Sequence, residues 1–506
     1  MDKVRLWNLD TSVPMGQERW AFIPKNALPY LKALLDNNYC HLYYVDQASQ
    51  LFDASIGPPT GFVADNATRT PASWRTILIG GMRLGGACAA LSSGRANAVD
   101  LPVSGIGYSS YFAIDVTNPE SPSVLWEFSD PALGFATTGP AILRVNDLDR
   151  TRNGKWFVVF GSGPTGPISN RQFMGTSDQT LKLFVVDLKT GAKLRTIEPR
   201  DSANTAIANA FAGSMINATA DFNLDYQDDA LYLGYVRENT PDGPGVWNQG
   251  GVLRLQTNGD VNPANWTAGT VIEDIGPVTS SVVRLQNNTY HTNWLYFGTG
   301  RYYFTTASLL DDPSTQRKLF GVREPCFVAN RNITSNCTSR VDPGTLINVG
   351  DTTIIAEGTA NMAGFPGWSI GLDNNTPVDY DGAGAKSYQA ERVITDPLAI
   401  SSGIVFFTTF RPYGDDCAIG GRTFLWAVRY NTGGAPSYAL QGKALMQVST
   451  ASVEQLDLGT AFSGNDTIHR GGRRSFALEG VPPTAQGLSL MSPPPPVRRI
   501  LHMKER

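Results

Sequence analysis

A pattern of strands recurs along most of the chain and limits the folds that the chain can adopt. In each copy, an apolar strand ends in small residues, and a later apolar strand ends in a turn of the Asp/Asn-Thr-Gly kind. The clearest copy runs from Trp156 to Gly163 and continues from Leu183 to Gly191. Further copies lie at residues 77–81 with 111–128, 231–234 with 252–255, 294–300 with 319–322, and 404–409 with 424–433. Repeated multi-strand units with glycine and aromatic residues at matching places are typical of β-propeller blades.

We therefore predict an all-β fold in which a β-propeller spans residues 16–470. The copies indicate six or seven blades, because long insertions obscure some of them. Residues 1–15 are expected to form a lead-in, and residues 471–506 an extended, proline-rich tail with a terminal strand. An array of β-sandwiches is the alternative, but the copies resemble one another too closely for unrelated strands.

One short helix is expected before the propeller. It begins near Pro24, and an apolar stripe of Leu28, Leu31, Leu34 and Leu35 follows. We expect this stripe to pack on the propeller. Residues 303–350 and 373–390 are expected to be long loops between blade strands.

The composition suits a sheet-rich extracellular protein. Only 17% of the 506 residues are charged, and the chain holds 51 glycines and 32 prolines. The net charge of −4 gives no basic field, so no nucleic-acid partner is predicted. No apolar run is long enough to predict a transmembrane segment. The first residues do not form a signal peptide, so export would need a preceding segment or an unusual route.

Five cysteines are present, and their pairing is not determined by the sequence. Cys326 and Cys337 flank a polar segment and could close a small loop. Cys40 and Cys88 could pair through space, which leaves Cys417.

We predict no enzymatic activity. The four histidines do not show the H-E-x-x-H spacing of metalloproteases, and no P-loop is present. Pairs of carboxylates occur in turn-like segments, where Asp residues commonly cap the backbone.

The segment from Asp221 to Asp229 is the strongest candidate for a binding site. Oxygen-bearing side chains fall at its positions 1, 3, 5 and 9, and position 7 offers a backbone carbonyl. Calcium takes six to eight oxygen ligands, and a tight loop can supply them from alternate residues. The predicted calcium ligands are Asp221, Asn223, Asp225, Gln227 and Asp229. The alternative is an acidic turn in which Asp and Asn side chains cap their own backbone.

Two features distinguish this loop from an EF-hand. Position 6 is Tyr226, where the sharp turn usually requires glycine, and position 12 is Tyr232 instead of a bidentate Glu. The flanking residues are apolar and typical of strands. We therefore predict a calcium loop between two strands, which Asp229 closes.

Several segments resemble the C-terminal propeller of PilY-type type IV pilus proteins. The resemblance covers nearly the whole chain from about Gly16 and is carried by residues 16–24, 41–46, 74–86, 115–119, 367–370, 391–395, 417–421 and 498–501. It implies a modified, quinoprotein-like propeller of seven blades. It also implies a place with minor pilins at the pilus tip or cell surface, and roles in pilus assembly, twitching motility and adhesion.

The resemblance also bears on the acidic loop. The family's calcium loop has the spacing D-x-[DN]-x-D-x-x-x-D, which residues 221–229 match. In the family, calcium occupancy opposes pilus retraction and calcium release permits it. Three features depart from the family: its large N-terminal region is absent here, Tyr226 replaces a common glycine, and no Arg-Gly-Asp is present. The adhesive ligand stays unknown.

Two other functions are compatible with a propeller. Quinoprotein dehydrogenases share blade repeats, but they commonly carry a vicinal disulfide, and no two cysteines are adjacent here. The third possibility is a structural propeller that only docks to minor pilins.

Overall fold

A computed structural model describes most of the chain. The described residues are 18–35, 43–57, 67–85, 109–145, 151–166, 168–169, 172–173, 175–239, 245–303, 314–329, 332–353, 355–380, 382–414, 420–436, 443–449, 452–464, 468–480 and 488–491. The predicted lead-in and the residues Cys40, Cys88 and Cys417 lie outside these ranges.

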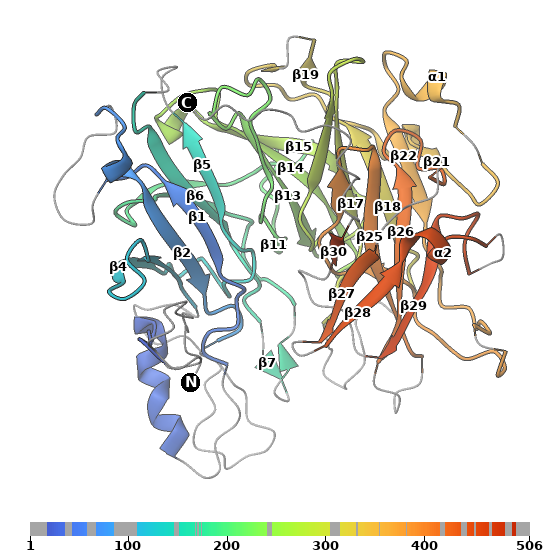
Figure 1. The fold of residues 1–506 in the computed structure, drawn as a ribbon, viewed down its shortest axis with the longest axis horizontal. Helices are drawn as coiled ribbons and strands as arrows, with labels where there is room; N and C mark the ends of the chain where they lie inside the picture. Colours follow the sequence, from blue (N-terminus) through green and yellow to red (C-terminus); the bar gives the residue numbers. More distant parts are fainter. Residues whose placement is uncertain are drawn as a thin grey trace, which may run out of the picture.

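Three sheets form from the first half of the chain, in chain order (Figure 1). The first contains β1 (Gln50–Ala54), β2 (Arg75–Gly81), β3 (Tyr111–Asp115) and β4 (Ser123–Phe128). The second contains β5 (Ala141–Val145), β6 (Lys155–Gly161), β9 (Leu183–Asp187) and β10 (Lys193–Ile197). The third contains β11 (Ala210–Ala212), β12 (Thr219–Ala220), β13 (Ala230–Arg237), β14 (Gln249–Gln256) and β15 (Thr267–Glu273).

Three more sheets follow. The fourth contains β16 (Val283–Asn287), β17 (Thr292–Gly298), β18 (Lys318–Arg323), β21 (Ile347–Asn348) and β22 (Gly367–Gly371). The fifth contains β23 (Arg392–Val393), β24 (Leu398–Ile400), β25 (Ile404–Pro412), β26 (Gly421–Arg429) and β29 (Arg474–Gly480). The sixth contains β27 (Lys443–Ser449), β28 (Ser452–Asp457) and β30 (Leu488–Met491).

The remaining elements are short. Two hairpins pair β7 (Ile168–Ser169) with β8 (Gln172–Phe173), and β19 (Phe327–Val328) with β20 (Asn332–Ile333). The helices are η1 (Lys25–Leu35), η2 (Pro71–Ser73), η4 (Pro263–Asn265), η5 (Pro343–Thr345), α1 (Glu357–Ala360) and α2 (Leu458–Ala461). Within the described ranges, no helix is long and apolar enough to cross a membrane.

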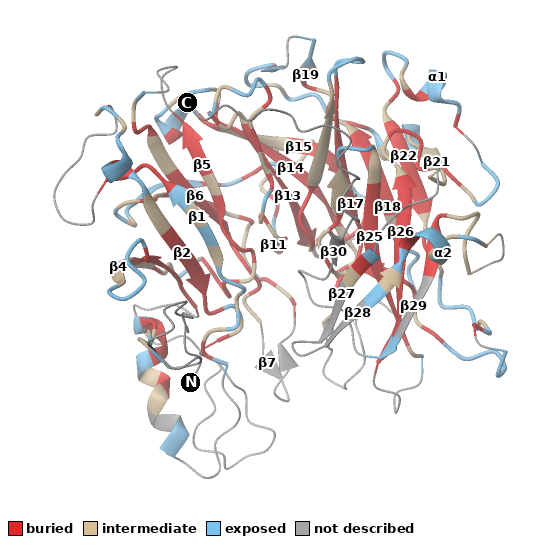
Figure 2. Ribbon diagram, in the orientation of Figure 1, coloured by how far each residue is buried: buried red, intermediate tan, exposed pale blue. Residues whose placement is uncertain are grey.

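Each sheet packs its face on the next sheet along the chain. One apolar core joins the first two sheets, a second core joins sheets two and three, and further cores join three with four and four with five. A smaller core joins the fifth sheet to the sixth. Because middle strands are covered on both faces, β17 is buried along its whole length, whereas the edge strand β10 is largely exposed. Figure 2 shows the same contrast between buried inner strands and exposed connections.

The glycines at the strand ends of the repeat allow this close stacking. A Cβ atom at Gly161 would collide with Ala212 of the third sheet, and one at Gly298 would collide with Val393 of the fifth. A side chain at either position would push neighbouring sheets apart.

The all-β, propeller-like fold is therefore confirmed. Six sheets of three or more strands occur in the described ranges, so the expectation of seven blades stays a prediction. Residues 318–323 form the inner strand β18, as the repeat copy at 319–322 predicts, although they lie within the segment 303–350 that was otherwise expected to be a long loop. Residues 474–480 lie in the expected tail, but they form β29, which pairs with β26.

The predicted N-terminal helix is present, although its packing differs from the expectation. Residues Lys25–Leu35 form a 3₁₀ helix, and Leu28, Leu34 and Leu35 are exposed. The buried face carries Ala27 and Tyr30 instead. The stripe prediction was wrong because Ala27 and Tyr30 occupy the buried side of the helix, whereas Leu28 and Leu34, which share a face at three residues per turn, lie on an exposed side.

Candidate metal-binding loop

The loop of residues 221–229 connects β12 to β13, so strands flank it as predicted. Ala220 pairs with Ala230, and the N–H of Asp229 donates to the carbonyl oxygen of Ala220 at 2.7 Å. The loop is thus closed at its base by the antiparallel pairing of its two ends.

Asp221 organises the first half of the loop. Its carboxylate accepts hydrogen bonds from the N–H groups of Leu224 at 2.7 Å, Asp225 at 3.2 Å and Tyr226 at 2.9 Å. Three backbone N–H groups of one turn therefore donate to a single carboxylate, and these bonds hold the backbone in this turn.

The other predicted ligands continue this arrangement. The N–H of Asp225 donates to Oδ1 of Asn223 at 2.9 Å, and the N–H of Gln227 donates to Oδ1 of Asp225 at 2.9 Å. The N–H of Phe222 donates to Oδ2 of Asp229 at 2.8 Å. The structure thus brings the side chains of all four predicted oxygen donors into one tight loop. An ionised carboxylate has about four lone-pair positions, so these bonds leave capacity for a cation.

The backbone turns sharply at the position where glycine was expected. Tyr226 has φ of 71° and Leu224 has φ of 62°, both in the left-handed region. A non-glycine residue there costs about 1–2 kcal/mol, because Cβ approaches the following carbonyl oxygen. Both side chains are exposed, so packing does not offset this cost.

Negative charge accumulates in the second half of the loop. The pKa of Asp229 is raised to about 6, mainly by burial and to a smaller extent by the charges of Asp225 and Asp221, while the hydrogen bond from the N–H of Phe222 lowers it. Burial also raises the pKa of Asp228 to about 7, although its carboxylate accepts the N–H of Arg144 at 2.8 Å. Burial is the main cause of both shifts, and the neighbouring carboxylates add a smaller contribution in the same direction.

Residues of the second sheet hold one side of the loop. The guanidinium of Arg144, in β5, donates to the carbonyl oxygen of Tyr226 at 2.9 Å, and the N–H of Asp228 donates to the carbonyl oxygen of Arg144 at 2.8 Å.

Residues of the fourth sheet hold the other side. Arg284 donates to the carbonyl oxygen of Asp221 at 3.4 Å, and the amide of Gln286 donates to that of Phe222 at 3.1 Å. The loop therefore lies where three consecutive sheets meet. No local sequence pattern connects Arg144, Arg284 or Gln286 with the loop, because they are distant from it along the chain.

The donor set suits a hard cation, since it consists only of oxygen atoms. No three His, Cys, Asp or Glu side chains within the described ranges form a group ready to hold a metal ion. The carboxylates of this loop are instead directed at its own amides. Nothing in the structure tests the five predicted ligands, which stay a prediction.

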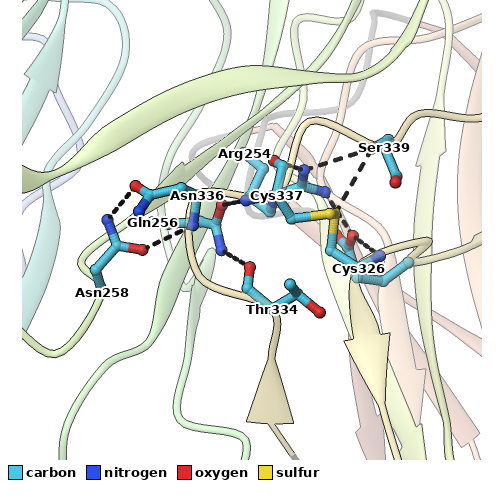
Figure 3. The surroundings of a disulfide bond; sticks show 9 residues. Arg254, Gln256, Asn258, Cys326, Thr334, Asn336, Cys337 and Ser339 are labelled. Atoms are coloured by element: carbon cyan, nitrogen blue, oxygen red, sulfur yellow. Dashed lines mark hydrogen bonds and ion pairs between the residues drawn. A yellow bond between two sulfur atoms is a disulfide. The ribbon is translucent and has the colours of Figure 1, made fainter.

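The expected pairing of Cys326 with Cys337 is present as a disulfide, with a Cα–Cα distance of 6.0 Å. It closes a segment that contains β19 and β20. Figure 3 shows polar side chains from and just after β14 around this disulfide.

A possible nucleophile also appears in the sequence. Residues Gly367–Gly371 read G-W-S-I-G, which matches the spacing of a hydrolase elbow. The structure places all five residues in β22, where they pair with β18, and Ser369 is buried. A hydrolase elbow needs a sharp turn between a strand and a helix. Residues 367–371 lie inside a strand, so they do not form such an elbow.

Comparison with known proteins gives sequence relatives that are described as type IV pilus biogenesis factors. No protein-family model matches the chain. The chain is 26% identical over 482 residues to a type IV pilus biogenesis factor PilY1 homolog of Xylella fastidiosa, covering 89% of this chain and 27% of that protein. It is 25% identical over 465 residues to the type IV pilus biogenesis factor PilY1 of Pseudomonas aeruginosa, covering 84% of this chain and 34% of that protein.

Comparison of the fold with solved structures also finds a PilY1 domain. The crystal structure of the Pseudomonas aeruginosa PilY1 C-terminal domain matches with a TM-score of 0.53 and 19% identity, covering 85% of this chain and 77% of that one. The chain spans about a third or less of the length of these curated relatives. The predicted resemblance to the PilY family is confirmed.

Proposed function

Because the chain is homologous to PilY1 type IV pilus biogenesis factors, we propose that it is a calcium-binding protein of the pilus tip or cell surface. It supports pilus assembly, the control of extension and retraction, twitching motility and adhesion. Its partners are minor pilins of the tip complex, and it acts without catalysing a reaction. The observation that carries the calcium proposal is the acidic loop at the junction of three sheets.

The physical basis of the proposal is the charge of that loop. Three of the predicted ligands are carboxylates within nine residues, and the charges of Asp225 and Asp221 add to burial in raising the pKa of Asp229. A dication bound to Asp221, Asn223, Asp225, Asp229 and the carbonyl of Gln227 would replace the repulsion between these carboxylates with attraction. Because the loop contacts the second and fourth sheets, calcium binding would stiffen all three sheets together.

Calorimetric titration of the calcium-free protein tests the site. We expect one site in the wild type, and a stabilisation of about 2.7 kcal/mol at a calcium concentration 100 times the Kd. Asp221→Ala and Asp225→Ala should each weaken binding at least tenfold, since each removes a predicted ligand. Asp274→Asn removes an exposed carboxylate after β15 and serves as the matched control.

Equal calcium affinity in Asp221→Ala and the wild type would contradict the site. The pilus role is tested separately, by binding of the purified chain to minor pilins with calcium and with a chelator. We expect retention of the minor pilins, and no retention under either condition would contradict a place at the pilus tip.

A further inference from the structure

We propose that the segment closed by the Cys326–Cys337 disulfide positions the acidic loop, so that reduction of this disulfide weakens cation binding. This inference rests on the proposed calcium site. It concerns residues that are not themselves cation ligands.

The first contact between the two regions is aromatic. Phe222 lies in the loop, between the predicted ligands Asp221 and Asn223, and is fully buried. Its ring meets that of Phe327 with centroids 5.3 Å apart and planes at 62°. Phe327 directly follows Cys326, and both phenylalanines and both cysteines belong to one apolar cluster. The place of the Phe222 ring therefore depends on where the disulfide holds Phe327.

The second contact runs through the end of β14. The side chain of Gln256 accepts the N–H of Cys337 at 3.0 Å and donates to the carbonyl oxygen of Thr334 at 2.8 Å. Across the sheet, Gln256 pairs with Ala230, the residue after Asp229. The adjacent Thr257 donates its N–H to the carbonyl oxygen of Asp229 at 3.0 Å.

A buried ion pair between Arg254 and Glu324 contacts the disulfide segment at both cysteines, and Figure 3 shows Arg254 beside Cys337. Arg254 contacts the carboxylate of Glu324 at 2.5 Å, and both side chains are inaccessible to solvent. Arg254 also donates to the carbonyl oxygen of Cys337 at 2.7 Å, while Glu324 accepts the N–H of Cys326 at 2.9 Å. The segment thus contacts the loop directly at Phe222, next to the first predicted ligand, and is joined through the end of β14 to the backbone of Asp229, the last one.

Reduction of the disulfide would allow the segment that it closes to move relative to the acidic loop. A dithiol such as dithiothreitol attacks one sulfur, the S–S bond breaks, and the second thiol of the reagent displaces the first cysteine. The products are two cysteine thiols and the cyclic oxidised reagent, so atoms and electrons balance. Linkage is reciprocal, and a bound cation must therefore make the disulfide harder to reduce.

The experiment measures calcium affinity by calorimetry in three forms of the full chain. They are the oxidised wild type, the wild type reduced with dithiothreitol, and the Cys326→Ser/Cys337→Ser double variant. We expect affinity to fall roughly fivefold or more in the last two forms, the lower range of typical coupling between sites. The double variant isolates this disulfide from the other cysteines.

A second pair of variants keeps the disulfide intact. Phe327→Ala should weaken calcium binding, because it removes the ring that supports Phe222. Val328→Ala is the matched control, since Val328 lies in the same strand and is exposed. In addition, calcium should raise the dithiothreitol concentration needed to reduce the wild-type disulfide.

Three outcomes can be separated. Weaker binding in Phe327→Ala and the double variant, with Val328→Ala unchanged, supports the inference. Unchanged affinity in Phe327→Ala overturns it and leaves the calcium site standing. No calcium binding by the oxidised wild type overturns the calcium site itself, and the inference with it.

Discussion

Two regions of this protein contain several buried or partly buried carboxylates. In one region arginine side chains pair with them, and in the other backbone amides donate to them. Between the end of β22 in the fourth sheet and the fifth sheet, Arg474 contacts Asp373 at 2.8 Å and Glu391 at 2.9 Å, and Arg470 contacts Asp373 at 2.9 Å. We call Asp373, Glu391, Arg411, Arg470 and Arg474 the arginine cluster. Although burial acts against it, the guanidinium groups lower the pKa of Asp373 below its usual value.

In the acidic loop, the carboxylates accept backbone amides, and the pKa of Asp229 is raised. Arg144 and Arg284 reach this loop and donate to its carbonyl groups. The arginine cluster supplies its own positive charge to its carboxylates, whereas the carboxylates of the loop are bound by backbone amides, and the proposed cation would supply the positive charge there.

The largest effect is expected from breaking the arginine cluster. Arg474→Met should destabilise the protein by about 3–5 kcal/mol, because it leaves the fully buried Glu391 without its arginine partner and removes one of the arginine partners of Asp373. Urea unfolding followed by tryptophan fluorescence measures this loss. Arg429→Met is the control, since its ion pair with Glu357 is partly exposed and should contribute about 1 kcal/mol or less. Equal losses in the two variants would contradict the role of the cluster.

Asp396 sharpens the comparison, because it is a buried carboxylate held by the N–H of Ser281 at 2.7 Å. Burial raises its pKa from 3.8 to about 6, so the folded protein binds this proton more tightly than the unfolded chain. Its contribution to stability is complete below pH 4 and is lost as the pH rises through 6. About two pKa units correspond to about 3 kcal/mol.

Asp396→Asn cannot ionise and should remove this pH dependence. Urea unfolding of the variant and the wild type at pH 4 to 7, without calcium, measures the difference. We expect the variant to gain stability relative to the wild type as the pH rises. A difference that stays constant over this range would show that Asp396 does not titrate there.

The smallest effect concerns the backbone of the loop. Tyr226→Gly and Tyr226→Ala remove the same ring, and only glycine relieves the left-handed conformation. Thermal unfolding should show the glycine variant to be more stable by about 1 kcal/mol. A more stable alanine variant would argue against a left-handed backbone at this position.

The sequence predicted the parts of the fold that depend on local patterns. Strands such as β6, β9, β17 and β26 are apolar runs that end at glycine or a polar turn, and each occurs where its copy was placed. The strands that flank the acidic loop were also predicted, and the pairing of Cys326 with Cys337 was one of the possibilities that the sequence left open. These features need only neighbouring residues to be recognised.

The sequence could not predict contacts between distant charged residues. Arg254 and Glu324 form a buried pair across 70 positions, and Arg474 joins Asp373 across 101. Charged residues usually lie at the surface, so Arg474 in the expected tail gave no signal of burial. The same applies to Arg144 and Gln286, whose contacts with the loop depend on assembled sheets.

The place of the loop between three sheets has a consequence for how the protein can be dissected. All five predicted ligands lie within nine residues, yet the contacts that hold them extend from Arg144 to Gln286. A peptide of residues 221–229 would keep every ligand and lose these contacts. Cation affinity would then be acquired late in folding, and it would report on the assembly of the middle of the molecule as much as on the loop.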